Sequence, residues 1–346
     1  MVSITVFAKR SATAAMCLLL CGCTTNELGT KNAQPKSREF FAMDTYMTMK
    51  VYGDGAEKAL NAAEFRILDL EGELSVTDND SEISALNNAD GEPVTVSDDV
   101  AVILRKAREI GNKTGGAMDI TLYPIVKEWG FTTGDYHIPS AEALSGLLEN
   151  VDYSRVDISG NAVTLPADFQ VDTGALAKGY ASDEAIRLFR ENGVDSGIVS
   201  LGGNVMALGA KPDGSDWRVS VVDPFAPDTD MCILGIRDKA VITSGNYERY
   251  FIGEDGKLYC HIIDSSTGCP AESGLVSVTV IGECGLECDA LSTALFVLGY
   301  EDAVGYWREY GGFDMILVTD DEKIFYTSGI ADSFTNVSDM NAEVIS

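Results

Sequence analysis

The chain has 346 residues, of which 45% are hydrophobic, and a formal net charge of −29 from 25 basic and 54 acidic side chains. This length is enough for one large or two small packed units with an ample core. The charge argues against nucleic acid or anionic lipid as a direct partner, because phosphate groups bind net positive surfaces. An anionic cofactor would need a local exception, such as a bound divalent cation.

The N-terminus has the three parts of an export signal. Lys9 and Arg10 form a charged region, residues 14–20 form a short apolar core, and Leu20-Cys21-Gly22-Cys23 resembles a bacterial lipobox. The apolar core is far too short to remain in a bilayer as a spanning helix. The pattern therefore predicts a lipoprotein signal that is cleaved after Gly22.

This interpretation sets the domain boundaries. Residues 1–22 are expected to be the signal peptide, and Cys23 becomes the lipidated first residue of the mature protein. Residues 23–37 are polar and lack apolar periodicity, so they are expected to form a tether. Residues 38–340 then form one domain outside the cytoplasm, held at the membrane by the lipid.

The first half of the chain alternates between strand and helix signals. Apolar residues alternate from Glu39 to Val51, which is typical of a strand, and a helical stretch then ends near Leu74. Ser81 is a candidate N-cap for a short helix, and Ser97 caps a helix that is predicted to end at Gly111. Gly115-Gly116 then precedes an apolar segment.

The second half is mostly strands. A short helix is predicted from Pro139 to Asn150 with Ser140 as its N-cap. The predicted strands that follow are 163–165, 197–201, 217–222, 240–243, 258–263 and 275–281. Since helices gather early and strands late, without sustained alternation, the pattern favours an α+β fold over a doubly wound parallel sheet.

Residues 168–183 look like a strand followed by a helix. Residues 168–171 end in a strand-like signal, and the apolar positions after Gly179 recur at helical spacing up to Gly193. Backbone N–H groups at such a helix start bind anions, and Lys178 adds a positive charge beside them. The alternative is a surface loop with an exposed lysine.

The cysteines do not define a site by themselves. Once Cys17, Cys21 and Cys23 are set aside with the signal, an odd number remains, so at least one thiol stays free. A disulfide is possible outside the cytoplasm. A zinc site among Cys260-His261, Cys269 and Cys284-x-x-x-Cys288 is a weaker alternative, because the spacing lacks paired C-x-x-C motifs.

Three polar clusters follow predicted strands: 200–205, 243–249 and 261–268. Loops at strand ends often carry function. Each cluster could equally be turn chemistry, since Gly and Asn accept positive φ and Ser, Thr and Asp bond to their own backbone.

Taken together and in order, the motifs closely resemble the FAD:protein FMN transferases, the ApbE family, over nearly all of the mature chain. The motifs that carry the resemblance are Phe41-Ala42-Met43-Asp44-Thr45, Ser81-Glu82-Ile83, Gly115 to Asp119, Val171 to Gly179, Leu201 to Asn204, Thr243 to Arg249, His261 to Asp264 and Asp289 to Ala294. The resemblance implies antiparallel sheets of a T-fold-like kind packed with helices, with the active site in a cleft between two halves.

The family's activity is a Mg²⁺-dependent transfer of FMN from FAD to a threonine or serine hydroxyl of a target protein, with release of AMP. The resemblance thus implies FAD as substrate and Mg²⁺ as cofactor. It also implies a separate acceptor protein, typically with Asp-Gly followed shortly by Thr, such as a subunit of a membrane redox pump or an extracytoplasmic electron carrier.

The resemblance also assigns roles to residues of this chain. The implied FAD contacts are Met43, Thr77, Ala117, Met118, Asp119, Asp172, Lys178 and Ile263. The implied metal ligands are the Ala175 carbonyl, Asp289 and Thr293, and His261 corresponds to a proposed catalytic base alongside Lys178. Two positions depart from the family: Thr77 stands where a tyrosine commonly faces the flavin, and Ser265 replaces a proline, which is expected to alter turn rigidity.

The residue types suit this chemistry. Attack of a hydroxyl on phosphorus requires positioning and neutralisation of charge on the phosphate oxygens, which Lys178 and a divalent ion would supply. Asp289 and Thr293 share a helix face at i, i+4 spacing and offer oxygens to a hard cation. Asp289 could instead be an N-cap of that helix, and His261 could be a half-buried strand residue bonded to a carbonyl. An FAD hydrolase and a non-catalytic flavin-binding lipoprotein remain alternative functions.

Overall fold

The computed structural model describes residues 34–346, so the predicted signal peptide, Cys23 and most of the tether lie outside the described residues. Its central feature is a nine-stranded sheet with the strand order β1-β2-β6-β7-β10-β15-β16-β17-β19. All neighbours are antiparallel except β17 and β19, which are parallel. Its strands are β1 (Lys36–Ala42), β2 (Thr45–Tyr52), β6 (Ser196–Leu201), β7 (Asn204–Leu208), β10 (Ala240–Gly245), β15 (Leu275–Gly282), β16 (Asp314–Thr319), β17 (Lys323–Thr327) and β19 (Asn341–Ile345).

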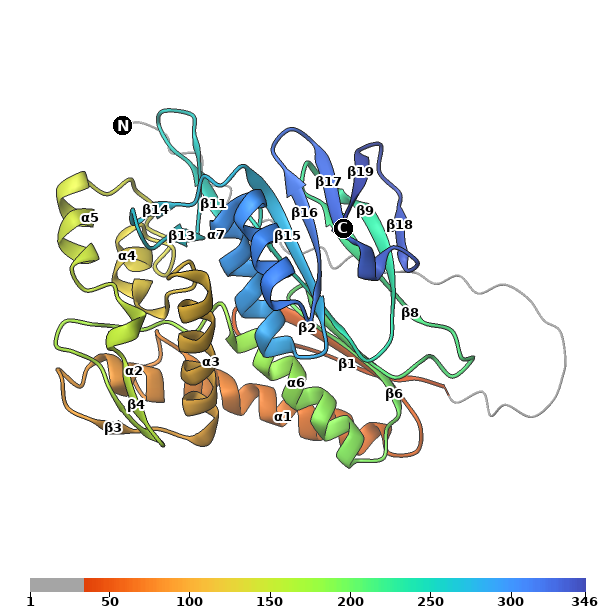
Figure 1. Cartoon of the computed structure of the whole chain (residues 1–346). Coiled ribbons are helices and arrows are strands. Elements are labelled where there is room, and N and C mark those ends of the chain that lie inside the picture. Colours follow the sequence, from red (N-terminus) through yellow and green to blue (C-terminus); the bar gives the residue numbers. More distant parts are fainter. Residues whose placement is uncertain (1–33) are drawn as a thin grey trace, which may run out of the picture.

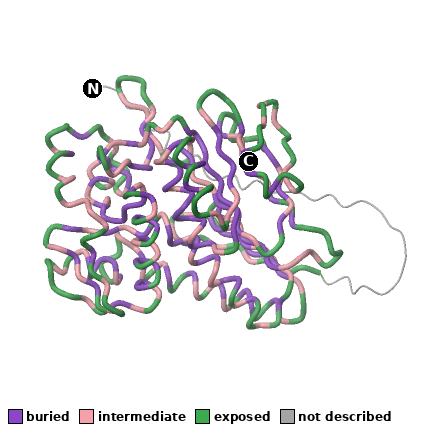
Figure 2. Tube along the Cα trace, viewed as in Figure 1, coloured by how far each residue is buried: buried purple, intermediate pink, exposed green. Residues whose placement is uncertain are grey.

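Both faces of this sheet are covered. Helices α1 (Ala56–Leu74), α6 (Ala177–Glu191) and α7 (Gly285–Tyr310) pack on one face, and α6 lies between the other two (Figure 1). A second sheet covers the other face; its strands, in the order β18-β9-β8, are β18 (Phe334–Asn336), β9 (Ala226–Ile236) and β8 (Trp217–Asp223). Every residue of the central strand β15 is buried, as expected for a strand between two layers, and Figure 2 shows buried chain throughout this region.

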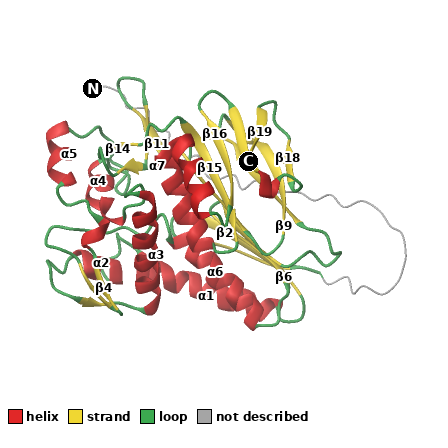
Figure 3. Ribbon diagram, viewed as in Figure 1, coloured by secondary structure: helices red, strands yellow, loops and turns green. Residues whose placement is uncertain are grey.

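A lobe made mainly of helices lies beside the sheet, at the left of Figure 3. Its helices are α2 (Glu82–Asn87), α3 (Asp98–Thr114), η1 (Ile120–Leu122), α4 (Tyr123–Glu128), α5 (Ala141–Leu148) and η2 (Tyr153–Arg155). Its small sheet has the strands β3 (Val94–Thr95), β5 (Ala162–Thr164) and β4 (Asp157–Ser159).

Two short strand pairs join the lobe to the sheet. They are β11 (Tyr250–Ile252) with β12 (Leu258–Cys260), and β13 (Ile263–Asp264) with β14 (Cys269–Pro270). Trp129 and Leu144 of the lobe pack against Phe251, Tyr259 and Ile263 of these pairs in a separate hydrophobic cluster. One further short helix, η3 (Ser328–Ile330), follows β17.

The predicted α+β class and the three predicted serine caps are confirmed. Ser81, Ser97 and Ser140 each accept a hydrogen bond from the backbone N–H three residues later, at 2.9, 3.2 and 3.1 Å. These bonds satisfy N–H groups that have no partner inside the helix, which explains why each helix begins where the sequence predicted.

Three strand predictions differ from the structure. The stretch from Glu39 to Val51 is two antiparallel strands joined by a tight turn at Met43 and Asp44, whose φ angles are 48° and 58°. Residues 168–171 form no strand, because the Asn87 side chain takes the place of a neighbouring strand: its Oδ1 accepts from Val171 N at 2.7 Å and its Nδ2 donates to Val171 O at 2.9 Å. The predicted strand 258–263 is also interrupted, at His261 and Ile262.

The structure also bears on a disulfide, a zinc site and a membrane-spanning helix within the described residues. Cys232, Cys260, Cys269, Cys284 and Cys288 are all free thiols. No group of three or more His, Cys, Asp or Glu side chains within residues 34–346 is arranged to hold a metal, so the zinc alternative is wrong for this part of the chain. None of the helices described there is both long and apolar enough to cross a bilayer.

Candidate functional site

Lys178 lies in the first turn of α6, and its charge acts on four ionisable side chains from other segments, which are Asp172, Glu248, His261 and Asp289. Burial raises the pKa of Asp172 and of Asp289, and the positive charge of Lys178 opposes both shifts. Burial also lowers the pKa of His261 to about 4, and the charges of Arg249 and Lys178 add to that effect. The fold therefore brings the predicted anion-binding lysine, two carboxylates and the candidate base into one electrostatic neighbourhood.

The N-terminal turns of α6 and α7 hold each other through two matching pairs. Asp289 Oδ2 of α7 accepts from Gly179 N of α6 at 2.8 Å, and Asp183 Oδ1 of α6 accepts from Gly285 N of α7 at 2.7 Å. Each helix supplies a glycine and an aspartate that are four residues apart in its sequence, so the two Gly-x-x-x-Asp segments bind each other reciprocally. Figure 1 shows the two helices packed together.

Glycine is required at this crossing. A Cβ on Gly179 would lie 2.3 Å from the Gly285 carbonyl oxygen, and a Cβ on Gly285 would lie 2.5 Å from the Gly179 carbonyl oxygen. The two backbones can approach this closely only without side chains. The crossing therefore fixes the position of Lys178, next to Gly179, relative to Asp289.

Asp289 is not an N-cap, so that alternative was wrong. Helix α7 begins at Gly285 after Cys284, and Asp289 is inside the helix with only 4% of its surface exposed. It uses Oδ2 for the Gly179 N–H, which leaves Oδ1 for another partner. The predicted end of this helix at Gly299 is a kink, with φ 78° and ψ 177°, after which α7 continues to Tyr310.

Three further polar groups of this region bear on a metal site at Asp289. Thr293 is one turn further along α7, and its hydroxyl lies 3.2 Å from Ser244 Oγ of β10. The Ala175 carbonyl accepts no hydrogen bond from any described residue, because Gly179 N donates to Asp289 instead. Asn204 Nδ2 is buried and faces Asp289, and this amide helps to lower the pKa of the Asp289 carboxyl against the effect of burial.

These residues fit a hard divalent cation. One carboxylate oxygen, one carbonyl and one hydroxyl leave room for waters and substrate phosphate, which is how Mg²⁺ is usually bound. The Asn204 amide beside them is a donor that helps to keep the Asp289 carboxylate charged. Ala175, Asp289 and Thr293 are therefore the residues that would hold the ion.

Asp119 and the backbone of Asp172 hold the loop at residues 119–121 in place. Asp119 Oδ1 accepts from Thr121 N and Oγ1 at 2.8 and 2.5 Å, and its Oδ2 accepts from Tyr153 N at 3.1 Å. Asp172 N donates to Ile120 O at 2.8 Å. Burial raises the pKa of Asp119 despite these donors. Both of its oxygens already accept protein hydrogen bonds, so Asp119 also shapes the loop that carries it.

Ala117 and Met118 precede Asp119 in the same loop. Ala117 is half-buried, and Met118 is buried. The departure at Ser265 has a structural consequence, because Ser265 Oγ donates to Gly116 O at 2.7 Å. This bond ties the loop of Ala117 to the loop after Ile263, whose side chain is buried among the aromatic residues of the lobe. A proline could not donate this bond.

His261 is half-buried directly after β12. Its Nδ1 lies 3.2 Å from the Arg249 carbonyl oxygen. A carbonyl only accepts, so Nδ1 carries the proton and Nε2 of the neutral ring is left as an acceptor. The bond to a carbonyl that we expected of a purely structural His261 is therefore present. It leaves Nε2 able to accept a hydroxyl proton.

Met43 and Thr77 lie at the edge of this arrangement. Met43 is held in the left-handed region, and its N–H donates to Glu71 Oε1 at 2.6 Å. Such a conformation is strained for a residue other than glycine, and strain of this kind often marks functional sites. Thr77 is exposed, and no hydrogen bond within residues 34–346 joins either residue to the other candidates.

Sequence reasoning gave no role to Asp183, Asn204, Arg249 or Ser244. The matching Gly-x-x-x-Asp segments were visible as a repeated pattern, but only the packing of α6 on α7 gives the pattern a meaning. Asn204 and Ser244 sat in motifs that turn chemistry could explain equally well.

The groups that the fold brings together indicate a class of enzyme. An α+β enzyme that acts on a phosphate-containing substrate would use such groups: a lysine in the first turn of a helix, a buried carboxylate and a neutral histidine. Comparison with known proteins narrows this class.

The sequence model of the ApbE family matches residues 43–317. The FAD:protein FMN transferase of Treponema pallidum is 33% identical over 340 residues, 91% of this chain and 92% of that protein. The FAD:protein FMN transferase of Klebsiella pneumoniae is 35% identical over 321 residues, covering 87% of this chain and 90% of that protein.

Solved structures agree. The crystal structure of the ApbE protein from Thermotoga maritima superimposes with a TM-score of 0.81 and 30% identity, over 86% of this chain and 98% of that one. The flavin transferase ApbE from Vibrio cholerae has a TM-score of 0.78 and 26% identity, over 87% of this chain and 99% of that one. The chain belongs to the ApbE family.

Proposed function

We propose that this protein is a Mg²⁺-dependent FAD:protein FMN transferase that attaches FMN to a threonine or serine of a target protein and releases AMP. Relatives that align with this chain over most of their length have that name. The observation that carries the proposal is the reciprocal crossing of α6 and α7, which sets Lys178 beside a buried aspartate with a free oxygen.

The chemistry follows from the residues. The acceptor hydroxyl oxygen forms a bond to the phosphorus of the FMN half, and the bond from that phosphorus to the bridging oxygen breaks, so AMP leaves with that oxygen. Lys178 neutralises charge on the phosphate oxygens and His261 Nε2 takes the hydroxyl proton. A divalent ion held by Ala175, Asp289 and Thr293 would add positive charge to the same phosphates.

The charge balance supports this division of roles. The chain is strongly acidic overall, yet Lys178 and Arg249 both act on His261 and on Asp172. A local positive field is what an FAD pyrophosphate needs in a protein with a net charge of −29.

The function is tested by incubating the protein with FAD, Mg²⁺ and a candidate acceptor and identifying the products. A transferase yields FMN-labelled acceptor and AMP. Free FMN with AMP would instead show a hydrolase, and unchanged FAD would show a non-catalytic flavin-binding protein. Omitting Mg²⁺ is the control for metal dependence.

We also propose that the protein acts outside the cytoplasm as a lipoprotein anchored through Cys23. The lipobox-like sequence before Cys23 supports this, and the acceptor would be a protein at the same membrane surface, such as a redox-pump subunit or an electron carrier. Metabolic labelling with a palmitate analogue should modify the parent and not Cys23→Ser; equal labelling would contradict the anchor.

A further inference from the structure

We propose that the target protein docks as an extended segment along the free edge of β12, so that its threonine or serine reaches His261. This inference rests on the proposed function, because only a polypeptide acceptor requires such a surface. Four observations on β12 and the cavity beside it carry the proposal.

The first observation is the hydrogen-bonding direction of β12. His261 N donates to Arg249 O at 3.0 Å, and Gly253 N donates to Lys257 O at 2.9 Å. Since bonded pairs alternate in an antiparallel ladder, Leu258 and Cys260 direct their N–H and C=O groups away from β11. Those four groups have no backbone partner among residues 34–346.

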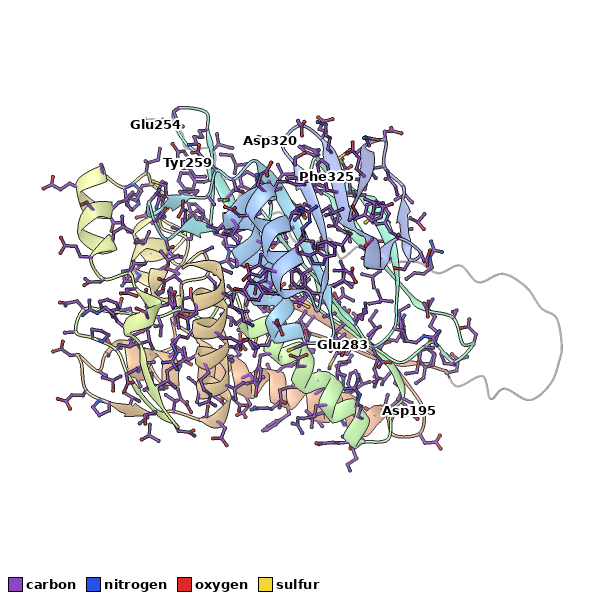
Figure 4. The ribbon with its side chains drawn as sticks, in the orientation of Figure 1. Asp195, Glu254, Tyr259, Glu283, Asp320 and Phe325 are labelled. Carbon is purple, nitrogen blue, oxygen red and sulfur yellow. The ribbon has the colours of Figure 1, made fainter. Side chains whose placement is uncertain are left out.

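The second observation is a cavity of about 730 Å³ on that side of β12. Leu258 and Cys260 form one wall, and the segment after β14, from Ala271 to Val276, forms the other. Trp129, Ile138 and Leu144 give it an apolar floor, and Ile138 is 46% exposed. Figure 4 shows Tyr259 and Asp320, which both line this cavity, at the same end of the molecule.

The third observation is an unpaired donor on the opposite wall. Ser273 Oγ is buried and has no hydrogen-bond partner in the described chain. The free N–H and C=O groups of the β12 edge suit a ligand that offers alternating N–H and C=O groups of its own. That ligand is an extended polypeptide, which binds sheet edges in this way.

The fourth observation is where the edge leads. β12 ends at Cys260, and the next residue is His261. Beyond His261 the walls meet, since Ala271 N donates to Ile262 O at 2.9 Å. A strand added to β12 therefore ends beside the imidazole that accepts the hydroxyl proton. None of the family-implied FAD contacts lines the cavity, so FAD and the acceptor would approach His261 from different directions.

An ion pair between Lys257 and Glu272 joins the two walls. Its side chains are 47% and 68% exposed, and exposed pairs of this kind contribute little to stability, so the pair does not prevent entry of a peptide.

A pair of proline variants tests the edge. Leu258 and Ile252 are paired across the hairpin, and their N–H groups point outward from its two edges. The N–H of Leu258 is on the edge at the cavity, and the N–H of Ile252 is on the opposite edge. Leu258→Pro removes an N–H that the acceptor would use, whereas Ile252→Pro removes the equivalent N–H on the far edge. Neither change removes a hydrogen bond of the ladder.

The probe is a fluorescent synthetic peptide that carries the Asp-Gly…Thr motif, and binding is measured by anisotropy with FAD present. Losing one hydrogen bond should weaken peptide binding by about threefold to tenfold in Leu258→Pro and leave Ile252→Pro near the parent. Ala141→Trp, which fills the rim of the cavity from an exposed position, should also weaken peptide binding. FAD affinity should stay unchanged in all three variants.

Peptide binding that is unchanged in Leu258→Pro and Ala141→Trp would overturn the proposal, as would a parent that does not bind the peptide. Equal losses in both proline variants would also overturn it, because hairpin integrity and not the β12 edge would then be the cause. A parent that binds the peptide through this edge but attaches no FMN would support the docking surface and contradict the proposed function, so the two failures are distinguishable.

Discussion

Lys178 is the residue on which the electrostatics of the site depend. Lys178→Met keeps the side-chain length and removes the charge that acts on Asp172, Asp289 and His261. Loss of a charge-assisted bond to phosphate costs about 1.5 to 3 kcal/mol, so FAD affinity should fall by about tenfold to a hundredfold. Titration calorimetry with FAD measures this, and unchanged affinity would remove Lys178 from the phosphate site.

His261 should determine the acid limb of the reaction. Its pKa is lowered to about 4, first by burial and then by the charge of Arg249, so the ring stays neutral from pH 7 down to about 5 and is protonated only below that. The transfer rate should therefore be insensitive to His261 protonation above about pH 5. A rate that falls with an apparent pKa near 6.5 and loses this limb in His261→Gln would show that the pKa of His261 is not lowered.

His261→Ala separates the catalytic role from a structural one. If Nε2 accepts the hydroxyl proton, the variant should lose about a hundredfold or more in transfer rate while FAD binding and thermal stability stay near the parent. Stopped-flow rates and a melting curve on the same sample give both values. A fall in stability that matches the fall in rate would support the structural role.

At the scale of elements, the α6–α7 crossing is the feature that aligns the site. Gly179→Ala would place a Cβ 2.3 Å from the Gly285 carbonyl oxygen, so the helices must separate. We expect a loss of about 1 to 3 kcal/mol in the free energy of unfolding, together with weaker Mg²⁺ binding because Asp289 moves away from α6. Urea unfolding and a metal titration followed by calorimetry measure the two effects.

Gly305→Ala is the matched control for this crossing. Gly305 is also in α7, but no atom lies within 4 Å of where its Cβ would be. Removing a helical glycine there should leave stability unchanged or raise it by about 0.5 to 1 kcal/mol. Equal losses in both variants would show that any glycine change in these helices is harmful, and the crossing would have no special role.

The elements also show what the sequence could predict. The serine caps and the helices they begin were readable because a local hydrogen bond defines each start. The start of α7 was not, because Cys284 gives no side-chain cap bond and Asp183 of α6, distant in sequence, caps the helix instead. The Met43–Asp44 turn was missed because alternation continues through both strands and neither residue is glycine.

At the scale of the whole molecule, the candidate site was predictable only as a set of motifs. The resemblance named residues from several loops, and the structure brings Lys178, Asp172, Asp289 and His261 together around one charge. Within residues 34–346, no hydrogen bond joins Met43 or Thr77 to any of these four. The roles of Asn204 and Asp183 depend on packing between α6, α7 and β7, which local periodicity does not encode.

The central claim is that a metal held by Asp289 supports FMN transfer, and a magnesium titration of Asp289→Asn tests it most directly. Asparagine keeps an oxygen for the Gly179 N–H, so the crossing of α6 and α7 should remain intact, but it removes the charge that binds a cation. The measurement is AMP release from FAD at increasing Mg²⁺, with a melting curve as the control for folding. We expect near-parent stability, a far higher Mg²⁺ requirement and loss of most activity. Parent-like magnesium dependence in a folded Asp289→Asn variant would contradict this expectation.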